Sequence, residues 1–158
     1  MTNEDTVFGF SLALAGGDIV LVEGPTITEN GVTKTLQTLQ LVHGKENLLQ
    51  ALNLRVLTPF GSDRLNTNYG LAIEAAFTQP GTIGQTKEYI KLSLVQTLAT
   101  DPRVHDVRDI LFGDDPGYLA QHSQVNVDAI RRSRAWPVEV ELDTVDTQTA
   151  TLSLNIGV

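Results

Sequence analysis

The sequence contains no cysteine and no long apolar run, and each absence excludes a class of protein. Without cysteine, the 158 residues cannot build a disulfide scaffold, a cysteine-ligated zinc site or a thiol nucleophile. No apolar run approaches the roughly 20 residues that cross a bilayer. Residues 1–7 carry two acids and no base, so they do not predict the basic start of a signal peptide.

Basic residues are also scarce. The chain has 11 Lys and Arg against 19 Asp and Glu, which gives a formal net charge of −8. Binding to nucleic acid needs clustered Lys and Arg to meet the phosphates, and an anionic membrane attracts the same residues. We therefore expect no nucleic-acid partner and no membrane partner. We predict a soluble protein that is made and kept in a reducing cytosol or in a particle assembled there.

Sequence motifs with a catalytic mechanism are absent. The chain has no Gly-x-Ser-x-Gly elbow, no phosphate-binding loop and no dinucleotide-binding glycine pattern. His43, His105 and His122 are too far apart in the sequence for one helix to present two of them to a metal. The sequence therefore predicts no enzyme activity, no cofactor and no metal site.

One enzymatic alternative stays open, a small peptidoglycan hydrolase. Glu74 lies in the apolar segment AIEAAF and is a candidate proton donor, with Asp63 or Asp101 as a second carboxylate. A chain with 19 acids contains such a pair by chance, so this hypothesis rests on composition alone.

The first 43 residues predict strands. Alternation over residues 8–14 indicates a half-buried strand, and residues 19–22 indicate a second that pairs with it as a hairpin and ends at Gly24-Pro25. Asn30-Gly31 predicts another turn, followed by an edge strand over residues 32–42.

The middle of the chain predicts three helices. Apolar spacing indicates helices over residues 45–57, 71–77 and 83–99, separated by a loop over residues 58–70. Proline ends the first helix at Pro59, Gln79-Pro80-Gly81 ends the second, and the last helix ends at Asp101-Pro102.

The remainder returns to strands. Residues 104–112 predict a strand, and residues 113–134 an excursion with a short helix near residues 125–132. Two strongly alternating strands then surround a turn at residues 143–148. Their apolar members include Val138, Val140 and Leu142 in the first strand and Leu152, Leu154 and Ile156 in the second.

Strands and helices that occupy separate stretches of sequence are typical of an α+β fold. We expect central helices packed on a mixed or antiparallel sheet, with a C-terminal β-hairpin. The predicted division is a β-rich N-terminal extension over residues 1–43 and an α+β domain over residues 44–158.

The C-terminal hairpin also suggests a way to bind a partner. Residues 149–156 contain no charge and no proline, the two features that block the edge of a sheet. The hairpin therefore either completes the protein's own core or offers an edge for strand addition.

Two charged segments have alternative interpretations. Asp101-Pro102-Arg103 is either a helix stop with a surface arginine or a bidentate ion pair at a helix–strand junction. The basic run Arg131, Arg132 and Arg134 is either a solvated turn or a docking patch for an acidic neighbour.

Four motifs, in order over residues 40–112, resemble a known family. They are Glu46–Leu52 (ENLLQAL), Leu57–Ser62 (LTPFGS), Asn68-Tyr69-Gly70 and Asp101–Val104 (DPRV). Together they are similar to the lysozyme-like baseplate wedge family of contractile phage tails and injection systems, also called sheath initiators. Where the family has Glu-Pro-Arg, this sequence has Asp101-Pro102-Arg103, which keeps the charge but shortens the side chain by one methylene.

The resemblance implies a structural protein. It would sit in the baseplate in a ring of six copies, joined to other wedge subunits around the tube and spike hub. It would template the first ring of the tail sheath protein by β-strand addition. A tail-tip protein of a non-contractile particle is a further alternative. The partner-binding residues expected on this basis are Tyr69, Gly70, Asp101, Pro102, Arg103, Val138, Val140, Leu142, Leu152, Leu154 and Ile156.

Overall fold

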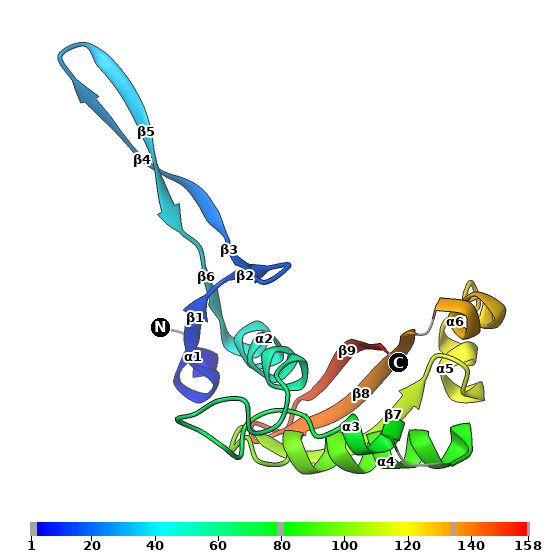
Figure 1. Cartoon of the computed structure of the whole chain (residues 1–158). Coiled ribbons are helices and arrows are strands. Elements are labelled where there is room, and N and C mark those ends of the chain that lie inside the picture. Colours follow the sequence, from blue (N-terminus) through cyan, green and yellow to red (C-terminus); the bar gives the residue numbers. More distant parts are fainter. Residues whose placement is uncertain (1–2, 79–80, 134, 158) are drawn as a thin grey trace. The chain divides into compact units, whose positions relative to one another are not determined.

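The fold, seen in a computed structural model that describes residues 3–78, 81–133 and 135–157, is α+β, as predicted. Helices and antiparallel sheets follow one another along the chain (Figure 1). The chain divides into two compact units, residues 1–50 and 51–158. The division falls inside helix α2, Gly44–Leu57, whose first residue follows the extension predicted over residues 1–43.

The first unit contains one short helix, three small antiparallel pairings and the start of α2. Strand β1 pairs with β6, β2 with β3, and β4 with β5. The bounds of these elements are α1 Asn3–Phe8, β1 Phe10–Leu12, β2 Leu14–Ala15, β3 Asp18–Ile19, β4 Leu21–Glu29, β5 Val32–Leu39 and β6 Leu41–His43.

The continuous strand predicted over residues 8–14 is wrong. Phe8 ends helix α1, and Gly9 follows with a positive φ of 72° while its N–H bonds the carbonyl of Asp5 at 3.0 Å. Two acids in the first turn, Glu4 and Asp5, favour this helix through its dipole. The predicted pairing of residues 8–14 with 19–22 is also wrong, because β1 pairs with β6.

The hairpin β4–β5 turns at Asn30-Gly31, which confirms the predicted turn. Both residues have positive φ, 50° and 77°, as the favoured two-residue hairpin turn requires. Gly24-Pro25 does not end the strand as predicted. It lies within β4, where the pairing with β5 shifts between Glu23 and Thr26.

Two amide side chains of α2 hold β1 in place. Asn47, buried at 6% exposure, donates from Nδ2 to the carbonyl of Phe8 at 2.7 Å and accepts from the Ser11 hydroxyl at 2.6 Å. Gln50 accepts from the N–H of Leu14 at 2.9 Å and donates to the carbonyl of Leu12 at 2.8 Å. These bonds tie the main chain on both sides of β1 to α2.

The second unit packs helix α4 against a three-stranded sheet. The sheet has the order β7-β8-β9 and is antiparallel, and α4 contacts β7. Ile90, Leu94 and Leu98 of α4 are fully buried. The bounds here are α3 Glu74–Thr78, α4 Ile83–Leu98, β7 Val104–Phe112, β8 Ala135–Thr144 and β9 Thr149–Gly157.

These elements largely follow the prediction. The three strands coincide with the predicted ones, and α4 begins at a capping box in which Thr82 and Gln85 bond each other's main chain. The predicted helix over residues 71–77 is shorter, because Leu71 is extended and bridges Pro59.

Two short helices occupy the excursion between β7 and β8, α5 (Pro116–Gln121) and α6 (Val127–Ser133). Helix α6 confirms the predicted helix, and α5 was not predicted. The chain enters the excursion at Gly113, where an added Cβ would lie 2.7 Å from Pro137 Cγ and 2.9 Å from Ile130 Cδ1. Gln79-Pro80, predicted as a helix end, lies outside the described residues.

Asn47→Ala should lower the free energy of unfolding by about 2 kcal/mol, because it removes the buried hydrogen bonds that the Asn47 amide makes with the carbonyl of Phe8 and the hydroxyl of Ser11. Urea denaturation followed by circular dichroism measures the change. Asn53→Ala, at an exposed position of the same helix, is the matched control and should change the value by less than about 0.5 kcal/mol. Equal effects of the two substitutions would contradict the assignment.

Candidate functional site

The segment between α4 and β7 forms a compact ion pair. Asp101 accepts two bonds from the Arg103 guanidinium, from Nε to Oδ1 and from Nη2 to Oδ2, both at 2.9 Å. It also accepts the main-chain N–H of Arg103 at 3.0 Å. The Asp101 side chain is 6% exposed and that of Arg103 24% exposed. Of the two interpretations of this segment, the structure has the bidentate pair, and both partners belong to the same turn.

The charge state of Asp101 follows from this geometry. Burial raises the pKa of its carboxyl, but the hydrogen bonds and charge of Arg103, with the charge of Arg55, outweigh burial and leave the pKa below its usual value. The same hydrogen bonds raise the pKa of Arg103. The pair therefore stays ionised, and it fixes the direction in which the chain leaves the helix.

Tyr69 and Gly70, from the loop before α3, lie near this junction. Arg55 of α2 places its guanidinium carbon 4.7 Å from the centre of the Tyr69 ring and donates to the hydroxyl of Thr100. Burial raises the pKa of Tyr69, Arg55 opposes the rise, and the negative charge of Asp101 adds to it. Of the residues that the resemblance named, Tyr69 contacts Arg55, and the charge of Arg55 also acts on Asp101. Sequence analysis missed Arg55.

Gly70 is required by close main-chain packing. Its φ is +108°, and an added Cβ would lie 2.6 Å from the carbonyl oxygen of Thr58 and 2.7 Å from that of Pro59. Its own carbonyl accepts the buried hydroxyl of Thr97 at 2.6 Å. The loop is thereby fastened to α4 near the junction.

The two C-terminal strands differ in how they are paired within the sheet. Strand β8 lies between β7 and β9 and is paired on both sides, so Val138, Val140 and Leu142 contribute buried side chains and no free edge. Of the two strands predicted for strand addition, β9 alone lies at the margin of this sheet.

Two hydrogen bonds show which main-chain groups of β9 face outward. Thr144 donates to the carbonyl of Gln148 at 2.9 Å, and Gly113 donates to the carbonyl of Pro137 at 2.8 Å. Because bonded pairs alternate along an antiparallel ladder, even-numbered residues of β8 bond β9 and odd-numbered residues bond β7. Leu152, Leu154 and Ile156 therefore direct their main-chain groups toward β8, and their side chains are buried.

The outward set consists of Thr151, Ser153 and Asn155. Their N–H and C=O groups point away from β8, and no strand within the described part of the chain pairs with that side of β9. Their side chains lie on the exposed face of the sheet. The main-chain groups on the outer side of β9 are therefore those of these three residues, whereas those of Leu152, Leu154 and Ile156 are directed toward β8.

Strand β7, at the opposite margin of the sheet, is poorly suited to pairing with a further strand. Its pairing with β8 shifts twice, between Val104 and Asp106 and between Val107 and Asp109. It also carries exposed charges at Asp106 and Arg108. Bulges and charges both oppose edge pairing, whereas β9 pairs with β8 without a shift over nine residues and carries no charge.

The other candidates do not gather into a site. Glu74, the proposed proton donor, is exposed as the first residue of α3. His43 lies 3.3 Å from Asp5, and His122 Nε2 lies 3.0 Å from Glu139 Oε1. Across residues 3–78, 81–133 and 135–157, no group of three potential metal ligands comes together. None of the helices described is long and apolar enough to cross a membrane.

The basic run is described only in part. Arg132 of α6 donates from Nε to the carbonyl of Asp128 at 3.0 Å. Arg134 and the side chain of Arg131 lie outside what the structure describes, so the predicted docking patch stays a prediction.

A comparison of the sequence with protein-family models gives no match, and a comparison with curated proteins gives none either.

Asp101→Asn should remove stability in a pH-dependent way. A carboxyl whose pKa is lowered by folding contributes stability above its unfolded pKa, about 3.9, and loses it as the pH falls through the folded pKa. The variant should be about 2 kcal/mol less stable at pH 7, and this difference should shrink below about pH 4. Denaturation curves at several pH values measure it. Glu88→Gln, an exposed acid of α4, is the control, and an equal pH profile for both variants would contradict the role of the pair.

Gly70→Ala should lower the free energy of unfolding by about 3 kcal/mol, because the new Cβ meets two carbonyl oxygens and a disfavoured φ. Gly84→Ala, in the first turn of α4 with 3.9 Å to its nearest neighbour, is the control and should be neutral or stabilising by up to about 1 kcal/mol. Thermal denaturation compares the two. A Gly70→Ala variant as stable as the control would show that the loop can move away.

Proposed function

We propose that this chain is a structural protein of the baseplate of a contractile phage tail or a related injection system. In this proposal it initiates the sheath by taking a strand of the tail sheath protein onto β9. The observation that supports it best is the free edge at Thr151, Ser153 and Asn155. The ordered motifs that resemble baseplate wedge proteins favour this assembly over others that use strand addition.

The edge suits an incoming strand for two reasons. Each outward residue offers one donor and one acceptor, so three residues provide six main-chain groups for a new ladder. The outward side chains are short and neutral, so they neither repel a second strand nor block its approach. Main-chain bonds supply affinity in this mode of recognition, and alternate side chains supply specificity.

The junction at Asp101-Pro102-Arg103 has a supporting role in this proposal. Its ion pair ties the end of α4 to the start of β7. The ion pair thus fixes the first strand of the sheet that carries β9 relative to the end of α4. A strand that binds a rigid edge loses less conformational freedom on the protein's side than one that must first order its template. We propose that six such copies join other wedge subunits around the tube and spike hub.

The hydrolase alternative makes a different prediction, that Glu74→Gln abolishes a lytic activity. Glu74 is exposed and lines a hollow of about 260 Å³ with Phe60, Leu71 and Ala72, but neither Asp63 nor Asp101, the second carboxylates considered, lines that hollow. Of the two functions, the free edge of β9 therefore favours the structural one.

Ser153→Pro should block sheath initiation while the protein still folds. Proline removes the N–H of residue 153, which points outward and makes no bond to β8, and proline is tolerated at such edge positions. Purified baseplates carrying the variant should seed at least tenfold fewer sheath rings in negative-stain images. Ser153→Ala, which keeps the N–H, is the matched control and should seed as the unmodified chain does.

A cooperative thermal transition must be retained by Ser153→Pro, because a misfolded chain would also fail to seed. This point variant is cleaner than deletion of residues 148–158, which removes the buried Leu152, Leu154 and Ile156 with the edge. Normal sheath growth on folded Ser153→Pro baseplates would contradict strand addition at β9.

A further inference from the structure

The edge of β9 offers main-chain groups in a fixed pattern. Thr151, Ser153 and Asn155 direct their N–H and C=O groups away from β8, and no strand among the described residues pairs with them. Residues 149–157 carry no charge and no proline, and their pairing with β8 has no shift. Charge, proline and bulges are common devices that keep further strands from an edge. An edge without them recruits a further strand.

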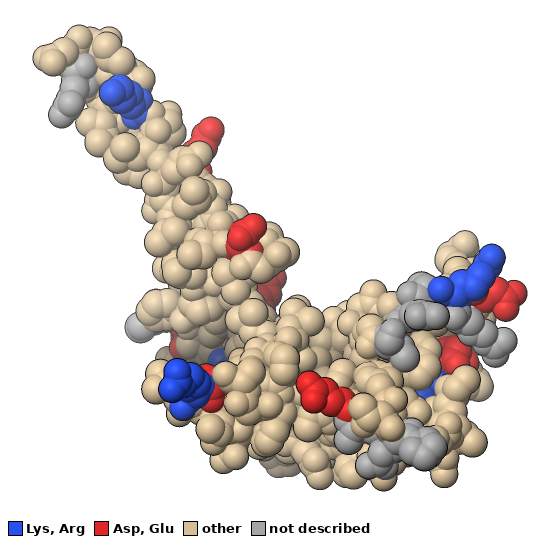
Figure 2. Space-filling view, in the orientation of Figure 1, with Lys and Arg blue, Asp and Glu red and all other residues tan. Residues whose placement is uncertain are grey.

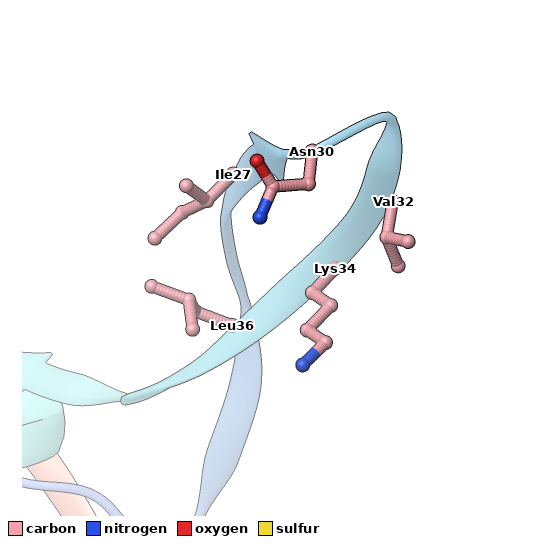
Figure 3. A pocket seen from close by; sticks show the side chains of 5 residues that line it. All are labelled: Ile27, Asn30, Val32, Lys34 and Leu36. Carbon is pink, nitrogen blue, oxygen red and sulfur yellow. The ribbon is translucent and has the colours of Figure 1, made fainter.

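The apolar side chains of the hairpin β4–β5 form a surface of a different kind. Ile27, Val32 and Leu36, with Asn30 and Lys34, line a hollow of about 390 Å³ (Figure 3). Figure 2 shows few charged side chains over this hairpin. Apolar contact has no direction, so the hollow does not define what fills it. The main-chain groups of β9 have both direction and spacing, so they restrict what can pair with them.

The chain itself contains few strands that could pair with β9 of another copy. Among the described residues, the strands of eight residues or more at a sheet margin are β4, β5, β7 and β9. Strand β4 contains Glu23 and Pro25, and β5 contains Lys34. Strand β7 contains Asp106 and Arg108 and shifts twice against β8. Strand β9 is the one of these four without a charge, so its best partner in a second copy is β9.

Strand β9 is complementary to its own image. Ser153 is the middle of its nine residues, so a two-fold axis through Ser153 pairs two antiparallel copies over their whole length. Ser153 then lies opposite Ser153 of the second copy, and Thr151 opposite Asn155 of the second copy. These residues form three outward pairs, and each pair exchanges two N–H···O bonds, so six bonds join the copies.

The side chains on both faces of such a joint are compatible. On the exposed face the opposed side chains are short and neutral, so no like charges meet. On the buried face the same axis places Leu152 opposite Leu154 of the second copy, which adds an apolar contact. Two sheets of three strands each would thus continue into one sheet of six.

We propose that two free copies of this chain pair through β9 into a two-fold dimer. Both copies use the same surface, so the contact closes at two copies and leaves β7 at both outer margins. The proposed function assigns this same edge to the sheath strand. A copy in the dimer therefore cannot take up a sheath strand until the two copies separate, and only this consequence rests on the proposed function.

Sedimentation of the full chain at increasing concentration tests for the dimer. The unmodified chain should change from one copy to two and no further. Ser153→Pro removes the N–H on the axis and should weaken dimerisation at least tenfold, whereas Ser153→Ala should dimerise as the unmodified chain does. A chain that stays monomeric at every concentration, or one that grows beyond two copies, would overturn the proposal.

A single thiol tests the position of the axis. The chain has no cysteine, so Ser153→Cys introduces its sole thiol. In a bonded antiparallel pair, opposite Cα atoms lie about 5.5 Å apart, which a disulfide can span. Thr151→Cys is the matched control, because its thiol faces Asn155 and lies about 14 Å along the strand from its counterpart.

With dissolved oxygen as the oxidant, the Ser153→Cys chain should form a disulfide-linked dimer at least tenfold faster than the Thr151→Cys chain. Electrophoresis without a reductant measures both rates. Equal rates would show that the thiols meet by random collision and would overturn the axis through Ser153.

The dimer and the proposed function can fail separately. A monomeric chain whose baseplates seed sheath rings would overturn the dimer alone, and a dimeric chain whose baseplates do not seed would overturn the function alone. If both hold, cross-linked Ser153→Cys dimers supplied to baseplate assembly should yield sheath rings only after a reductant is added. Rings without reduction would overturn the mutual exclusion of dimer and sheath.

Discussion

The double pairing of β8 is the constraint on which the second unit depends. Alternate residues of β8 turn their main-chain groups to β7 and to β9, so the central strand has none left for another chain. The sheet can therefore grow only at its margins. Bulges and charges occupy the β7 margin, and the β9 margin is regular and uncharged. The location of the proposed binding edge follows from this alternation and not from any side chain of unusual chemistry.

Local patterns predicted the second unit well and the first unit poorly. Alternation over residues 136–142 and 150–156, and helical spacing over residues 83–99, match β8, β9 and α4 because each pattern reflects one buried face. The alternation over residues 8–14 was overridden. Strand β6 takes the place of the hairpin partner that the pattern implied, and Asn47 and Gln50, more than 30 residues away, bond the main chain around β1. Such distant polar contacts leave no periodic signal in the sequence.

The junction at Asp101 and Arg103 and the edge of β9 could be predicted only in part, because some of their contacts join residues that are distant in the sequence. Asp101 and Arg103 are two residues apart, so their pairing is a local matter and could be foreseen. Arg55 reaches Thr100 only through the fold. Along β9, hydrophobic alternation tells which side chains are buried but not which N–H groups point outward. That direction is fixed by the turn at residues 144–148. The hydrogen bond from Thr144 to Gln148 there determines that the even-numbered residues of β9 bond β8 and the odd-numbered ones point outward.

Pro137 has a consequence for the fidelity of folding. In the native register its missing N–H faces β7 beyond Phe112, where its carbonyl accepts from Gly113 and no donor is needed. If β8 slipped by one residue, the position without a donor would turn toward β9 and interrupt that ladder. The same slip would move Glu139 and Glu141 to the buried face. A sheet in which β8 has slipped by one residue would thus be destabilised in two independent ways. The native register, which exposes the β9 edge, is therefore also the register that the sequence of β8 favours.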